Sequence, residues 1–386
     1  MSTIVRATSP AEFLALVPHL LGCTPRNSLA LVTFAGGRSL GALRIDLPGP
    51  DAVSDIENVA ATVIGMACKV PRTDAIAAVV YTKTKLADAE AAPHHPLVEA
   101  LLARADICGL RVQDALIVGS DGWDSLLAPG VDGARSLDEI VPIPHLPADG
   151  EIESDQFAAA QLPDVPPAEA TAVHRLLTDA AHLLSPEGER RRLPGRRHAA
   201  AEAVAEDLAD PSALFEAFLD PATPPDVPRI AAVSFCLQRA VLRDVALVQA
   251  VGDLATGDAA YAVLCAHADG RPLPAEIGRL MCGEGTRPEP PRLLRALERC
   301  RRVAAATPRA GRAGPLAACA WLAWATGRST HAAVYATQAL AIEPHHGLAD
   351  IVRTMTDQGR VPEWLFDPRP ITSPAGTGSS RGSRAR

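Results

Sequence analysis

Two short runs of the chain, residues 28–34 and 75–81, are apolar at almost every position (SLALVTF and AIAAVVY). Runs of this length and composition are typical of strands that are buried on both faces. Apolar residues recur at helical spacing over 56–67 and again over 97–105, and the second helix is followed by a further strand at 111–119 around the apolar residues 115–118. This strand–helix alternation predicts parallel strands joined by right-handed crossovers, in a small mixed α/β sheet covered by helices.

Local signals mark where the elements of this first part begin and end. The segment 9–12 (SPAE) is a capping box with proline at the first helical position, and the helix that it opens must kink or end around Pro18. The pair Gly36-Gly37 is a tight-turn signal, so residues 28–47 are predicted to form a β-hairpin. A second capping box at 54–57 (SDIE) opens the next helix.

The pattern changes after residue 119. Residues 125–168 are rich in proline, glycine and aspartate, and from about Pro167 onward the pattern is helical, with breaks at 185–195, 220–228 and 283–291. The chain is therefore expected to comprise four parts: an α/β domain at 1–150, a helical connecting region at 151–228, a helical C-terminal domain at 229–369, and a disordered Gly/Ser/Arg-rich tail at 370–386.

One pair of helices near the C-terminus has a repeat-like pattern. A helix that contains Trp324 is followed by a turn at Gly327, and the next helix carries small residues seven positions apart, Ala332 and Ala339, before Pro344 ends it. This spacing resembles a tetratricopeptide-type unit, because small residues let two helices approach closely. An ordinary antiparallel helical hairpin is the alternative.

Composition limits the functional classes. The 386-residue chain has a net charge of −8, which argues against broad binding to nucleic acid or anionic membranes. No secretory signal or run of about 20 uncharged apolar residues is present, so a cytoplasmic location is expected. The eight cysteines, none in a Cys-x-x-Cys pair, indicate reduced thiols. High alanine content and only three lysines are typical of a GC-rich bacterial genome.

Three segments carry a resemblance to a known family. They are the Gly-x-x-Pro-x-x-Ser turn at 22–28, the strand and tryptophan loop at 114–126 (DALIVGSDGWDSL), and the helical segment at 316–344. On these segments the chain resembles a bacterial family described as domain of unknown function 4192, over most of residues 9–368. The resemblance implies an architecture and no reaction. Many members have clustered cysteines after the tryptophan loop, but here 109–235 contains none, so no metal or redox role is carried over.

The best candidate site follows from topology. Ligands of open α/β sheets bind at the carboxyl ends of the strands. The second strand ends at Asp46, the third is followed by Lys83 and Lys85, and the fourth is followed by Asp121 and Trp123. Lysine suits a phosphate or carboxylate, and Trp123 is placed to stack on a ring. The alternative is that these are solvated loop residues, with the tryptophan packed onto the sheet.

Other chemistries lack their signatures. The sequence has no Gly-x-Ser-x-Gly elbow, no phosphate-binding loop and no dinucleotide-binding glycine pattern. The histidine pairs 94–95 and 345–346 stand beside prolines and are expected on the surface, and Arg243-Asp244 is expected to be an ion pair at the surface or between helices. We therefore predict no metal and no cofactor.

Three functional hypotheses follow. The first is a non-enzymatic module whose α/β domain binds a small anionic ligand or a partner and whose C-terminal helices contact a protein. The second is an enzyme that acts on an anionic small molecule at the strand ends. The third is nucleic-acid association through the arginine-rich segment 187–198 (EGERRRLPGRRH) and the basic tail. The sequence leaves open whether the protein is an enzyme.

Overall fold

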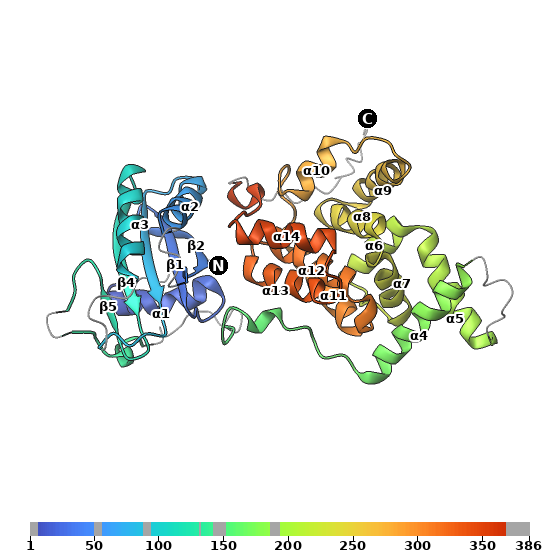
Figure 1. The fold of residues 1–386 in the computed structure, drawn as a ribbon, viewed down its shortest axis with the longest axis horizontal. Coiled ribbons are helices and arrows are strands. Elements are labelled where there is room, and N and C mark those ends of the chain that lie inside the picture. Colours follow the sequence, from blue (N-terminus) through green and yellow to red (C-terminus); the bar gives the residue numbers. More distant parts are fainter. Residues whose placement is uncertain are drawn as a thin grey trace, which may run out of the picture. The chain divides into compact units, whose positions relative to one another are not determined.

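The structure is a computed structural model, and it describes residues 7–49, 56–87, 94–130, 133–141, 152–185 and 194–367. The chain divides into two compact units, residues 1–161 and residues 162–386. The first unit contains a sheet with its helices and the second contains helices (Figure 1). The mixed α/β class expected for the first part, followed by a mostly helical part, is confirmed.

The sheet of the first unit has five strands in the order β2-β1-β3-β4-β5. Strand β1 lies between β2 and β3 and is antiparallel to both, whereas β3 and β4 are parallel and β5 is antiparallel to β4. Strands β2, β3 and β4 therefore run in the same direction. The strands are β1 (Ser28–Ala35), β2 (Arg38–Asp46), β3 (Ala75–Tyr81), β4 (Arg111–Val118) and β5 (Trp123–Ser125).

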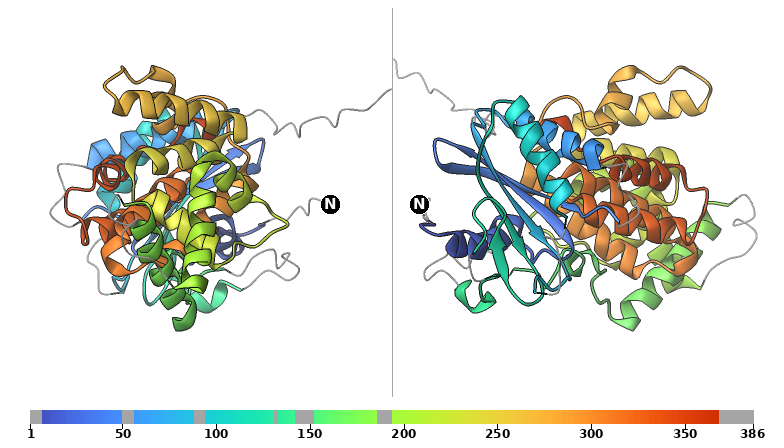
Figure 2. Two further views of the ribbon diagram at one scale, coloured as in Figure 1. Left: turned by 90° about the vertical axis from the view of Figure 1, so that its right-hand side faces the viewer. Right: turned by 60° about the vertical axis from the view of Figure 1, so that its left-hand side comes forward.

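Helices cover both faces of this sheet. Helices α2 (Ile56–Lys69) and α3 (His95–Ile107) pack side by side on one face, over Leu29, Leu31 and their neighbours (Figure 2). Helix α1 (Pro10–Leu21) covers the other face, over the alternate residues of the same strands. Because successive side chains of a strand point to opposite faces, one apolar run fills both cores.

The first helix and the hairpin follow the local signals, with one difference. Ser9 caps α1 as predicted, but the helix runs through Pro18 to Leu21 and ends at Gly22, whose φ of 72° is left-handed. The proline lies in the last turn, so it removes only one backbone bond near the end of the helix. The predicted hairpin is confirmed, with positive φ at Gly36 and Gly37. The first two residues of the predicted capping box at 54–57 lie outside the described residues.

The second unit is a helical assembly, and its first helices, α4 to α6, pack against α7, α8 and α11. The segment predicted as a helical connecting region thus belongs to the same compact unit as the later helices from residue 162 onward. The predicted tail at 370–386 lies outside the described residues. The helices are α4 (Pro167–Leu183), α5 (Gly195–Ala209), α6 (Pro211–Leu219), α7 (Val227–Leu237), α8 (Ala240–Val251), α9 (Leu254–Ala268), α10 (Ala275–Met281), α11 (Pro290–Ala306), α12 (Ala313–Ala325), α13 (Ser329–Leu340) and α14 (Gly347–Asp357).

Helix α12 lies at the centre of this unit, and all 13 of its residues are buried. It packs against α8, α11, α13 and α14. Its two indoles are satisfied by backbone oxygens, because Trp321 Nε1 donates to Met281 O and Trp324 Nε1 donates to Arg360 O. A helix so enclosed presents no side chain to a partner.

Candidate functional site

The carboxyl ends of β2, β3 and β4 meet at one edge of the sheet, together with the amino end of β1. The register places Asp46 opposite Ser28, Ser28 opposite Tyr81, Tyr81 opposite Val118, and Val118 opposite Trp123. These five residues form one rung across all five strands, which we call the terminal rung. Opposed residues of paired strands point to the same face, and Tyr81, Val118 and Trp123 pack with the core on the α1 face.

An arginine ties the first two positions of the rung together. Arg44 Nη1 donates to Ser28 Oγ at 2.7 Å and to Asp46 Oδ1 at 2.8 Å. The Arg44 side chain is 9% exposed, whereas that of Asp46 is 64% exposed. The Asp46 carboxylate is therefore already held by a neighbouring guanidinium on its own strand.

The loops that follow β3 and β4 are tied to each other by Asp121. Its carboxylate accepts the backbone N–H groups of Leu86 at 2.7 Å and Ala87 at 3.2 Å. These bonds, with the charge of Lys85 nearby, hold the pKa of Asp121 below its usual value. The structure thus places Lys85 near Asp121, and Asp121 has a clear structural role. Lys83 is exposed in the same loop.

Trp123 is buried rather than displayed. The residue is 1% exposed and belongs to the core on the α1 face, and the guanidinium carbon of Arg135 lies 4.7 Å from its ring centroid. Paired backbone bonds between Trp123 and Arg135 hold this cover in place. The alternative of a tryptophan packed onto the sheet is the one that the structure bears out.

The terminal rung contains two enclosed polar atoms without a partner among the described residues, Tyr81 OH and Trp123 Nε1. Burial raises the pKa of the Tyr81 phenol, so it stays protonated and is a donor. The indole N–H is a donor only. Each such orphaned group costs about 1–3 kcal/mol. Tyr81 and Arg44 are the residues of this edge that sequence reasoning missed. The alternation of side chains along β2 and β3 could have identified them, because it places both on the same face of the sheet as Trp123.

The Gly-x-x-Pro-x-x-Ser turn is held by backbone and amide bonds. Arg26 N–H donates to Gln156 Oε1 at 3.0 Å, and Gln156 Nε2 donates to Arg26 O at 2.9 Å. Asn27 takes a left-handed φ of 47°, and Ser28 then starts β1. The turn therefore sets the position at which β1 begins, at the terminal rung.

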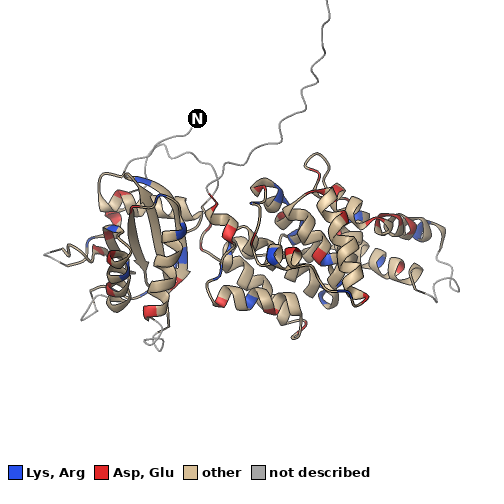
Figure 3. Cartoon of the chain, turned by 90° about the horizontal axis from the view of Figure 1, so that it is seen from above, with Lys and Arg blue, Asp and Glu red and all other residues tan. Residues whose placement is uncertain are grey.

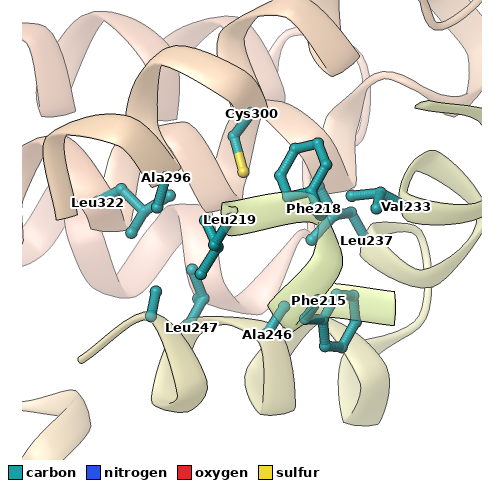
Figure 4. Close-up of a pocket in the computed structure, with 11 residues that line it drawn as sticks. Phe215, Phe218, Leu219, Val233, Leu237, Ala246, Leu247, Ala296, Cys300 and Leu322 are labelled. Atoms are coloured by element: carbon teal, nitrogen blue, oxygen red, sulfur yellow. The ribbon is translucent and has the colours of Figure 1, made fainter. Parts of the chain in front are cut away.

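The helical unit contains a small apolar cavity (Figure 4), with room of about 20 Å³ for the centre of a water-sized sphere. Apolar space of this size stays dry and holds no polar ligand. Cys300 lies on its wall, and burial raises the pKa of that thiol to about 12, so it is unreactive. The lining residues are Phe215, Phe218, Leu219, Val233, Leu237, Ala246, Leu247, Ala250, Ala296, Cys300 and Leu322.

A buried charged cluster joins α8 to the start of α14. Arg243 donates to Asp244 Oδ1 at 2.9 Å, and its Nη1 lies 3.3 Å from His346 Nε2. His346 Nδ1 accepts the N–H of Ala349 and so caps α14. The surface position predicted for His346 is wrong, because this cap and Arg243 enclose the ring. Burial and Arg243 lower the pKa of His346, against the opposite effect of Glu343 and Asp244.

Charges of both signs are interspersed over the helices (Figure 3). Within the described ranges, no three His, Cys, Asp or Glu side chains gather to hold a metal ion. None of the helices in the described part of the chain is long and apolar enough to cross a membrane.

Comparison with known proteins identifies the architecture and leaves the chemistry open. The family model described as Domain of unknown function (DUF4192) matches residues 10–363. No curated protein and no solved structure matches the chain. Because the family model covers nearly the whole chain, the protein belongs to the DUF4192 family.

Proposed function

We propose that the first unit is a binding module that takes a small anionic ligand at the terminal rung. The observation that carries this proposal is the pair of enclosed donors, Tyr81 OH and Trp123 Nε1, on one rung. Two strand spacings separate their Cα atoms, which is about 10 Å. Lys83 follows β3 two residues beyond Tyr81 and adds a positive charge next to this edge.

The donors define the class of ligand. A phenol that stays protonated, an indole and an ammonium all offer hydrogens, so they favour a ligand with phosphate or carboxylate oxygens. The unpaired donors lose their desolvation penalty when such oxygens accept from them. The ligand therefore gains from each bond more than it would from a donor on the surface.

The same chemistry favours binding over catalysis. Proton transfer at this edge needs an acceptor such as the carboxylates of Asp46 and Asp121. Asp46 already accepts from Arg44. Asp121 accepts from two backbone N–H groups, which lower its pKa and weaken it as a base. An enzyme acting on the same anionic class is the alternative, and conversion of a bound compound would identify it.

Thermal unfolding of the full chain with inorganic phosphate, citrate and adenosine monophosphate tests the proposal. We expect at least one of these anions to raise the unfolding temperature. The rise should fall in Lys83→Ala and in Tyr81→Phe, because each removes one donor. Lys69→Ala is the matched control, since Lys69 ends α2 near the opposite edge of the sheet. An equal rise in all four proteins would contradict the proposal.

We also propose that the pair α12 and α13 is tetratricopeptide-like and that α13 and α14 contact a protein partner. Supporting this, Ala332, Ala336 and Ala339 are buried along α13, which packs closely on α12. Ile351 on α14 is 55% exposed, an apolar side chain available to a partner. Ile351→Glu should leave the unfolding temperature unchanged and abolish partner recovery in cross-linking; recovery equal to that of the wild type would contradict this proposal.

The eight cysteines are all unpaired, which fits a reducing cytoplasm as the place where we propose that the protein works.

A further inference from the structure

Two exposed cysteines lie at the ends of neighbouring helices of the first unit, away from the terminal rung. Cys68 lies in the last turn of α2, and Cys108 is the C-cap of α3. The two helices pack against each other, the thiol of Cys108 is near enough to raise the pKa of Cys68, and both cysteines are exposed to solvent. Both helices lead into strands, β3 and β4, whose amino ends share one edge, so the thiols meet at the edge opposite the terminal rung.

The backbone on both sides of this contact is well fixed. The N–H of Cys108 donates to Arg104 O, and Gly109 with a φ of 69° turns the chain into β4. Helices α2 and α3 pack along the same core, which includes Ala67 and Ala105. A disulfide needs the two sulfur atoms about 2.05 Å apart, and rotation of side chains on two neighbouring helix ends moves the sulfurs toward each other.

We propose that Cys68 and Cys108 form a site of reversible oxidation, at which a low-molecular-weight disulfide cross-links α2 to α3. One cysteine thiolate attacks a sulfur of the small disulfide, and the leaving thiolate takes up a proton. The second cysteine then attacks the mixed disulfide and releases the second small thiol. Two cysteine thiols are oxidised to one disulfide, and one small disulfide is reduced to two thiols, so atoms and electrons balance.

The environment makes Cys68 a slow nucleophile. Burial and the neighbouring Cys108 raise the pKa of Cys68, so this thiol stays protonated at neutral pH. Either cysteine can make the first attack, and the other then resolves the mixed disulfide. The thiols of Cys236, Cys300 and Cys319 are buried and have raised pKa values, so they are closed to the same reagent.

The cross-link would close a loop that contains β3, α3 and the lysines beside the terminal rung. Closing a loop of this length restricts the unfolded chain and leaves the native contacts in place. Oxidation is therefore expected to raise the unfolding temperature of the first unit by several degrees. Reduction should reverse the rise.

Oxidised glutathione, added to the full chain under native conditions, tests the proposal by intact mass and peptide mapping. The wild type should lose two hydrogen atoms and yield one linked peptide that contains Cys68 and Cys108, and dithiothreitol should reverse this. Cys68→Ser should instead keep a glutathione adduct on Cys108. Cys282→Ser, which removes an exposed cysteine of the helical unit, is the control and should form the same link.

Two results would overturn the proposal. One is a wild-type chain that ends with separate glutathione adducts on Cys68 and Cys108 and no link between them. The other is a pair of free thiols at these positions under conditions in which Cys282 carries an adduct. Either result would mean that the two sulfurs do not meet in solution.

Discussion

Replacing Tyr81 by phenylalanine removes one enclosed hydroxyl and keeps the ring that packs in the core of the first unit. In the ligand-free protein this hydroxyl has no partner among the described residues. An orphaned donor costs about 1–3 kcal/mol, so Tyr81→Phe should stabilise the first unit by about 1–2 kcal/mol. With a urea dependence of about 1–3 kcal/mol per molar, the unfolding midpoint should rise by roughly 0.5–1 M.

The sign should reverse when a ligand accepts the hydroxyl. The lost bond then costs about 0.5–1.5 kcal/mol, and a loss of 1.4 kcal/mol weakens binding about tenfold. The same substitution is therefore expected to stabilise the dialysed protein and to weaken anion binding. A purely structural tyrosine would not produce opposite effects in the two states.

The assay must report on the first unit alone, because the two units need not unfold together. Hydrogen exchange of peptides that cover β3 during urea unfolding gives this readout. Tyr261→Phe is the matched control, since Tyr261 is exposed on α9 and its hydroxyl should contribute within about 0.5 kcal/mol. Destabilisation of dialysed Tyr81→Phe would refute the reasoning, because it would mean that protein groups already satisfy the hydroxyl.

Three further predictions concern the helical unit. His346→Asn keeps an acceptor for the N–H of Ala349 but removes the titrating ring. Because the pKa of His346 is lowered in the folded state, the wild type should lose stability relative to this variant as the pH falls below about 6.5. Urea midpoints at several pH values measure this difference. Gly314→Ala should destabilise by about 1–3 kcal/mol or more in thermal unfolding, because a Cβ would collide with the carbonyl oxygen of Leu237, and an unchanged midpoint would contradict this packing. Val233→Ile adds one methylene at the apolar cavity and should stabilise by about 0.5–1 kcal/mol in the same assay; a loss of stability would mean that the cavity cannot accept it.

The sequence predicted the strands best where burial leaves a compositional pattern. The runs at 28–34 and 75–81, and residues 115–118 within the strand predicted at 111–119, all lie in strands, because a strand segment buried on both faces must be apolar. It did not predict that β1 lies between β2 and β3, because strand order depends on contacts between distant segments. The three-residue strand β5 was missed because it is too short to show a period and is held by its pairing with β4.

The sequence predicted which strand ends share one edge, and only in part how the side chains lie there. Crossovers after β2 and β3 bring the carboxyl ends of β2, β3 and β4 to one edge, and the register agrees. Whether a side chain at that edge is displayed or covered is a different matter. Trp123 is covered by Arg135, twelve residues further along the chain, through a backbone pairing that no local pattern reveals.

The nucleic-acid alternative was predicted for residues 187–198 and the tail, and the arginines of α11 form a further basic element to weigh as a phosphate-binding face. Arg292 binds both oxygens of Glu216, Arg302 binds both oxygens of Glu169, and Arg299 donates to the carbonyls of Phe218 and Asp220 at the end of α6. Each of these cations joins two helices of the unit, so contact with a phosphate would exchange an internal bond for an external one. Nucleic-acid affinity comes mainly from lysine and arginine side chains that neutralise phosphates and release the counterions condensed on the nucleic acid. An arginine-rich helix in a chain of net charge −8 is therefore better explained as a set of internal clamps than as a phosphate-binding face.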